Sequence, residues 1–196
     1  MRILTILLGG AMAIAACCVG ARPSPPTTTT TPVIDMDNPL MARGYLAQAS
    51  SSDQFEIMSG QLAQQMAASL QVRNFGNLLI AEHTRTNRML IDAALAAGLV
   101  PPPPGLLPAQ QVLLAQLRAE APGRGFDVAF KNAQISAHRA ALLLHWNYAA
   151  SGDVPVLRNV ASQAVPLVQM HLAQAQRLNV IQAPPSASEA QSSPAP

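Results

Sequence analysis

The sequence predicts an all-α fold, an up-down four-helix bundle with a short extra helix between the second and third long helices. The middle of the chain is rich in Ala, Leu, Gln and Met and has few β-branched runs, a composition that favours helices. Its apolar residues recur at every third or fourth position, which is the helical period. Short turns between neighbouring segments favour antiparallel packing, so the segments are expected to close into a bundle.

The first two long helices are expected at residues 40–69 and 72–98. In the first, Asp53 precedes Glu56 by three residues, which is the spacing of a capping pair. This helix is therefore expected to kink or break near the serines at 50–52. Consecutive prolines at 101–104 end the second helix, and the short extra helix is expected at 109–120.

The last two long helices are expected at residues 125–150 and 153–181. Gly123 and Gly125 precede the third long helix, and the Ser-Gly-Asp sequence at 151–153 supplies the turn and the cap before the fourth. Pro166 lies inside the fourth helix, where it lacks a backbone donor and should bend the helix.

The N-terminal residues have the pattern of a bacterial lipoprotein signal. Arg2 is followed by an apolar run and then by small residues directly before Cys17. We therefore expect residues 1–16 to be a signal peptide and Cys17 to carry the lipid, with an ordinary signal peptide cut nearby as the alternative. Cys18 stands where an Asp would favour retention in the inner membrane, so a periplasmic protein anchored to the outer membrane is expected.

Two segments of biased composition flank the helical region. Residues 17–38 are rich in Pro and Thr, which favours an extended tether, and residues 183–196 form a Pro/Ser/Ala tail that is expected to be disordered. Residues 39–182 remain for one helical domain.

Composition and motifs exclude several classes of function. Charged residues make up 11% of the chain, the formal net charge is +2, and no basic patch is present, which argues against nucleic-acid binding. The domain has no cysteine, no Gly-x-Ser-x-Gly motif and no glycine-rich phosphate loop. An enzymatic activity is therefore not predicted, and the sequence identifies no protein partner.

Polar residues fall on faces that the helical period turns toward the core. His83 lies within the apolar stripe of the second helix, and His171 lies near the centre of the apolar arc of the fourth. Glu56 stands at the edge of the core face of the first helix. The third long helix carries a polar strip between two apolar stripes, made of Asp127, Gln134, His138 and His145.

These inward groups form either a hydrogen-bonded network or a ligand site, because buried polar groups need partners. The network candidates are Asp127, Gln134, His138 and His145. The candidate metal ligands are Glu56, His83, His138 and His171, since neutral imidazole is the commonest metal ligand and bundles build sites from inward groups on facing helices.

The position of each residue along the bundle axis tests whether these candidate ligands can lie close together. Counting residues from the turns places Glu56 level with His83, but it offsets His138 and His171 by roughly 7 Å along the axis. No Glu is followed by His at the third position, so a di-iron oxidase site is disfavoured. The expectation is no cofactor, with a transition metal such as Zn, Fe or Cu as the alternative.

Several short motifs resemble those of the family called domain of unknown function 4142. They are Glu56-Ile57-x-x-Gly60-x-Leu62-Ala63, Phe75-x5-Ala81-Glu82-His83-Thr84-x-x-Asn87, Phe126-Asp127-x-x-Phe130 with Gln134 and His138, and Pro166 with His171. The family usually has Asp-His where this chain has Glu82-His83. The resemblance covers about residues 40–180 and implies a ferritin-like helical bundle in the bacterial envelope, without an established activity.

Two functions follow as hypotheses. The first is a lipid-anchored envelope protein, attached to the membrane through Cys17, with a structural, interaction or stress-related role. The second is a metal-binding, ferritin-like protein with a His/Glu site inside the bundle. A small apolar ligand held between the helices is a third hypothesis, because a bundle rich in Ala and Met can leave a cavity.

Overall fold

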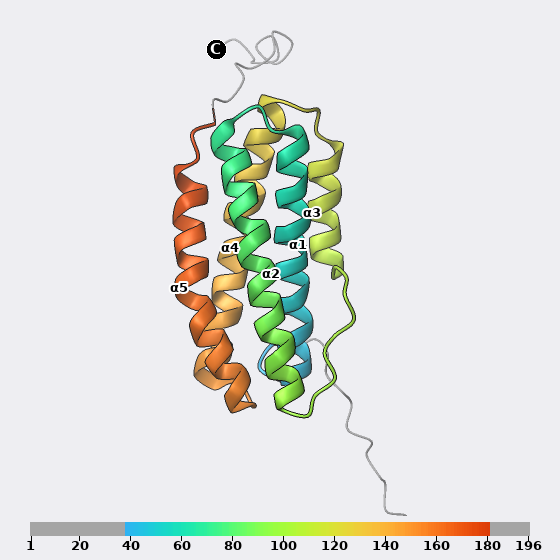
Figure 1. The fold of residues 1–196 in the computed structure, drawn as a ribbon, viewed down its shortest axis with the longest axis vertical. Coiled ribbons are helices and arrows are strands. Elements are labelled where there is room, and N and C mark those ends of the chain that lie inside the picture. Colours follow the sequence, from blue (N-terminus) through green and yellow to red (C-terminus); the bar gives the residue numbers. More distant parts are fainter. Residues whose placement is uncertain (1–37, 181–196) are drawn as a thin grey trace, which may run out of the picture. The chain divides into compact units, whose positions relative to one another are not determined.

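The computed structural model describes residues 38–180, which form five α-helices and no β-strand (Figure 1). The helices are α1 (Ala42–Met66), α2 (Leu70–Ala96), α3 (Pro108–Ala119), α4 (Arg124–Ser151) and α5 (Pro155–Arg177). The predicted all-α class is confirmed, and every expected helix is present with ends displaced by a few residues. The predicted signal peptide, Cys17, nearly all of the tether and the C-terminal tail lie outside the described residues.

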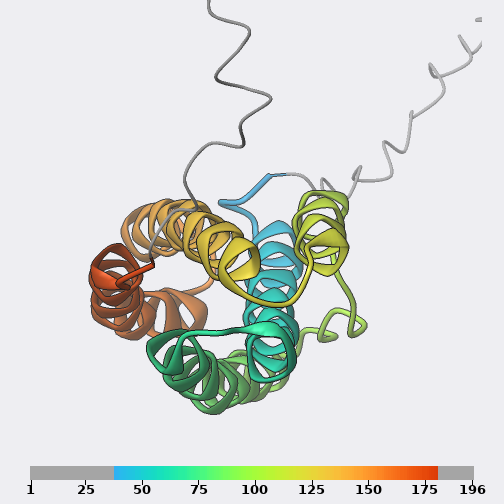
Figure 2. The ribbon, with the colours of Figure 1, turned by 90° about the horizontal axis from the view of Figure 1, so that it is seen from above.

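The four long helices lie side by side around a common core, in the order α1, α2, α5, α4 when viewed from above (Figure 2). The shorter α3 lies outside this ring, beside α1 and α4. The segment from α2 to α4, which includes α3, returns along the length of the helices, so α2 and α4 run in the same direction (Figure 1). Each long helix is therefore antiparallel to both of its neighbours. No helix within residues 38–180 has the length and apolar character that crossing a membrane requires.

The helices α1 and α2 approach each other closely because glycines face each other at their contact. A Cβ atom added to Gly60 would lie 2.6 Å from the carbonyl oxygen of Gly76, which is closer than real Cβ contacts. A side chain at either position would push the helices apart. The two glycines thus allow α1 and α2 to form a tight pair.

The core consists of two apolar clusters with a polar layer between them. One cluster contains Phe55, Phe75 and Phe130, and the other contains Tyr45 and Leu90. On α1, α2 and α4, buried polar residues stand in sequence between members of the two clusters. This layer is where the histidines lie.

The predicted break in the first helix is wrong, because α1 runs continuously through the serines at 50–52. Those serines make contacts outside their own helix. The Ser50 hydroxyl donates to Asn87 Oδ1 of α2 at 3.0 Å, and Ser51 Oγ accepts from the Leu107 N–H at 2.7 Å. Asp53 is buried and bonds to α2 rather than capping a helix start. α5 likewise continues through Pro166.

Candidate metal centre

Three histidines from three helices meet in the polar layer. His83 comes from α2, His138 from α4 and His171 from α5, and their exposed fractions are 3%, 1% and 0%. One ligand atom from each residue lies within 4.8 Å of those of the other two. The ring centroids are separated by 5.2 to 5.7 Å. The structure thus brings together three of the four residues expected from the sequence as metal ligands.

Each of these imidazoles is held by one ring nitrogen. Nδ1 of His83 lies 2.7 Å from Asp53 Oδ1, and Nε2 of His171 lies 2.6 Å from Glu82 Oε2. His138 donates its Nδ1–H to the backbone carbonyl of Gln134 at 2.9 Å. The hydrogen bonds to carboxylate or carbonyl oxygen fix the orientation of the rings, as such partners do for metal-ligating histidines.

The opposite nitrogen of each ring is buried without a hydrogen-bond partner among residues 38–180. These atoms are His83 Nε2, His138 Nε2 and His171 Nδ1. A buried nitrogen without a partner loses its hydration and gains nothing in return, at a cost of about 1–3 kcal/mol. Three such atoms on one cluster are a marked departure from the rule that buried polar groups are satisfied.

Glu56, the fourth expected ligand, stands beside this cluster rather than within it. It is 1% exposed, and its Oε1 lies 3.7 Å from His138 Nδ1, the nitrogen that already binds Gln134. Both of its carboxyl oxygens are buried without a hydrogen bond among residues 38–180. Burial raises the pKa of Glu56 to about 8, although the charge of His83 works in the opposite direction.

Electrostatics keep two of the three histidines neutral. Burial and the nearby charge of His83 lower the pKa of His138 to about 3, and the same two causes lower the pKa of His171. Burial also disfavours the charged form of His83, but the hydrogen bond and charge of Asp53, with the charges of Glu56 and Glu82, leave its pKa raised. The acidic groups around His83 thus favour positive charge at its position.

The polar strip of α4 does not form a single site. Gln134 and His138 are joined by a hydrogen bond, and Gln134 also donates from Nε2 to Ser59 Oγ at 2.8 Å. Asp127 accepts the Ser69 N–H at 2.9 Å and so holds the turn between α1 and α2. His145 lies near the opposite end of α4, where its Nδ1 and the Tyr45 hydroxyl are joined at 3.0 Å. All of the strip is buried, including His145 at 8% exposure.

Sequence reasoning did not identify the two carboxylates that hold the histidines. Asp53 lies one helical turn before Glu56 on the inward face of α1, and Glu82 directly precedes His83 on α2. Since successive residues of a helix are about 100° apart, Glu82 points toward α5 while His83 points into the core. The two carboxylates could have been found in the sequence by asking which acidic residue on a neighbouring helix can reach each inward histidine.

This arrangement has the chemistry of a transition-metal site. Imidazole nitrogen suits Zn²⁺, Cu²⁺ and iron, and metal–nitrogen bonds of about 2.0–2.1 Å fit between rings at this spacing after small rotations. The buried Glu56 carboxyl could lose its proton when an ion binds and so offset part of the ionic charge.

Comparisons with known proteins are consistent with the fold. A family model described as a domain of unknown function (DUF4142) matches residues 27–178. A comparison with curated proteins finds no match.

Solved structures of CopM are similar to this chain. The silver-bound form is 14% identical with a TM-score of 0.58 and covers 70% of this chain and 93% of that one. The Cu(II)-bound form is 15% identical with a TM-score of 0.59, over 70% and 94%. At these identities the likeness establishes the fold alone. A dodecameric thioferritin of Bacteroides fragilis, with 15% identity over 72% of this chain and 87% of that one, reaches a TM-score of only 0.49 and supports no inference.

Proposed function

The chain belongs to the DUF4142 family, as its motifs predict, and from its three-histidine cluster we propose that it binds a transition-metal ion inside the helix bundle. The ligands are His83, His138 and His171. The observation that supports this proposal is the set of three converging imidazoles, each with one nitrogen anchored and the other buried without a partner. A bound ion would satisfy all three nitrogens at once.

The ligand atoms limit which metal ions the site can bind. Three neutral imidazoles favour Cu²⁺, Zn²⁺ or iron over Mg²⁺ and Ca²⁺, which prefer oxygen ligands. Glu56 is the nearest additional donor, and as a carboxylate it would offset part of the ionic charge. CopM, with a similar fold, has been solved with Cu(II) bound, which makes copper the first ion to test here.

Metal analysis of the purified protein tests the proposal. The full chain, isolated without chelator or affinity metal, is expected to hold one Cu, Zn or Fe per chain, or to take up one equivalent of Cu²⁺ from solution. Its melting temperature should fall when EDTA removes the ion, because an ion that binds only the folded state stabilises it.

Variants assign the ligands. His83→Gln and His171→Gln should each lose stoichiometric metal and EDTA sensitivity. Tyr148→Phe is the matched control, because it removes a buried polar group away from the cluster and should retain the ion. A wild-type chain that takes up no metal and melts identically with EDTA would contradict the proposal. The histidines would then form a structural network, which fits the alternative of an interaction or stress-related role in the envelope.

We further propose that this family member is a lipid-anchored protein of the bacterial envelope, on the periplasmic side of the outer membrane. Support comes from the small residues before Cys17 and the apolar run that precedes them. Cys17→Ser should release the protein from the membrane fraction and abolish incorporation of labelled fatty acid. Cys18→Ser is the matched control and should leave both unchanged. Equal labelling of wild type and Cys17→Ser would contradict the anchor.

We also propose that α1, α2, α4 and α5 form the predicted four-helix bundle in its ferritin-like version, with α3 in a long connection instead of a simple up-down turn. The antiparallel neighbours and the single crossover between α2 and α4 support this topology (Figure 1).

A further inference from the structure

A cavity of about 140 Å³ lies inside the ring of long helices and shares a wall with the histidine cluster. Its buried end is formed by Tyr45, Ala49 and Asp53 of α1 and by His145 of α4. Asp53 is the residue whose Oδ1 binds His83 Nδ1, at 2.7 Å. The cavity therefore reaches the carboxylate that holds a proposed metal ligand.

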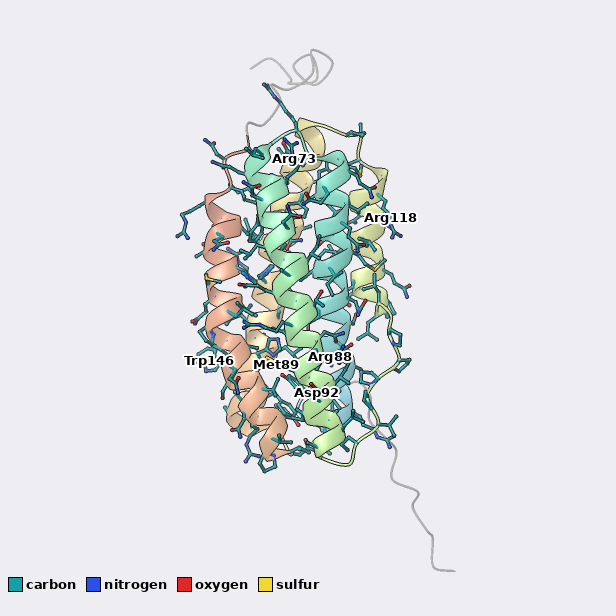
Figure 3. The ribbon with its side chains drawn as sticks, in the orientation of Figure 1. Arg73, Arg88, Met89, Asp92, Arg118 and Trp146 are labelled. Atoms are coloured by element: carbon teal, nitrogen blue, oxygen red, sulfur yellow. The ribbon has the colours of Figure 1, made fainter. Side chains whose placement is uncertain are left out.

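The cavity opens between α2 and α5. Its lining includes Arg85 and Gln163, which are exposed, and Met89 and Leu167, which are half-buried. Met89 lies along the seam between these two helices (Figure 3). By contrast, the contact between α1 and α2 is closed by backbone at Gly60. The seam between α2 and α5 is thus an open path from solvent toward the polar layer.

A buried site needs such a path, because the three histidines are at most 3% exposed and an ion must pass protein atoms to reach them. We infer that this cavity is the chamber through which a transition-metal ion reaches His83, with the Asp53 carboxylate at its inner end as a transient ligand. This inference rests on the proposed function. The Met89 thioether on the way in is a soft donor and the Asp53 carboxylate at the inner end is a hard one, a combination that a borderline cation such as Cu²⁺ can use.

Arg85 allows a prediction of how charge at the rim changes the uptake rate. Its guanidinium lies at the rim, so it repels an approaching dication and slows uptake. Arg85→Gln should therefore accelerate uptake, and the acceleration should shrink at high ionic strength.

The kinetics of Cu²⁺ uptake test the chamber. The metal-free full chain is mixed with glycine-buffered Cu²⁺ in a stopped-flow instrument, and the copper absorption is followed over time. Gln163→Trp would cover the mouth, and Gln169→Trp places the same side chain on an exposed position of α5 that does not line the cavity. Ala164→Leu would fill the cavity, and Ala150→Leu adds the same carbons at an exposed position of α4 that does not line it.

Gln163→Trp and Ala164→Leu are expected to slow both uptake and release by about tenfold or more, with one Cu²⁺ still bound at equilibrium. The two control variants should match wild type. If Gln163→Trp loads fully at the wild-type rate, this cavity is not the entry route, although the metal site itself is unaffected. The ion would then enter past Glu82, which is partly exposed and lies beside His171. This surface variant decides the question even if Ala164→Leu fails to fold. Absence of copper from wild type would overturn both proposals.

Discussion

Replacing Glu56 by Gln should stabilise the metal-free protein, and the gain should grow with pH. The carboxyl of Glu56 is 1% exposed and has no hydrogen bond among residues 38–180, so its charged form is poorly solvated. Burial raises its pKa from 4.5 to about 8. Gln has nearly the same shape and carries no charge at any pH.

The direction and size of this stability gain follow from the different proton binding of the folded and unfolded chains. Between pH 4.5 and 8 the folded chain keeps the Glu56 proton, whereas the unfolded chain loses it. The stability of wild type therefore falls by about 1.4 kcal/mol for each pH unit in this window. At pH 7 the accumulated penalty is about 3 kcal/mol, and at pH 5 it is below about 1 kcal/mol. Glu56→Gln removes this penalty.

Urea unfolding in the presence of chelator, at pH 5 and at pH 7, measures the effect. Glu56→Gln should exceed wild type by about 3 kcal/mol at pH 7 and by little at pH 5. Glu120→Gln is the control, because Glu120 is exposed and its replacement should change the free energy of unfolding little at either pH. A gain of equal size at both pH values, or a loss at pH 7, would refute the assignment of Glu56 as a buried neutral acid.

Three other results are expected. Gly60→Ala should destabilise the fold by about 1–3 kcal/mol in urea unfolding, because its Cβ meets the α2 backbone, whereas Gly125→Ala has room and should not. Asp53→Asn should weaken Cu²⁺ binding about 10- to 100-fold in competition titrations by removing the charge behind His83, whereas Asp92→Asn on the exposed face should leave it unchanged (Figure 3). Affinity for Cu²⁺ should also fall as the pH is lowered, because the ion displaces a proton from His83, and since the pKa of His83 is raised this loss should begin at a higher pH than for an ordinary histidine.

The helices and their inward faces could be predicted from the sequence because both depend on local properties. Apolar periodicity and the Gly and Pro positions determine where each helix runs and which side is buried, and His83, His138 and His171 were correctly expected to point inward. The break expected in α1 was wrong because a capping spacing is also the spacing of two inward residues on one helix face. Tertiary bonds from Ser50 and Ser51 favour a continuous helix there.

The contacts within the site could not be predicted in the same way. Counting from Gly152 separated His138 and His171 by roughly 7 Å, yet their ring centroids lie 5.4 Å apart. α4 ends at Ser151 and α5 begins at Pro155, so the extended residues between them consume part of the counted offset. Long imidazole side chains close the remainder. Positions that depend on how a turn is built are not contained in helical periodicity.

The distribution of the proposed ligands predicts that a bound ion would hold two pairs of helices together. α1 and α2 form one tight pair, whereas His138 and His171 belong to α4 and α5, so an ion bound to His83 and the other two histidines links both pairs. In the metal-free state, the cluster crosses the seam between α2 and α5 through the hydrogen bond between His171 and Glu82. Removal of the ion should therefore speed amide hydrogen exchange in α5 more than in α1, because α5 loses its cross-link whereas α1 keeps its contact with α2. Equal acceleration in all helices would show that the ion stabilises the core as a whole and does not act as a link across this seam.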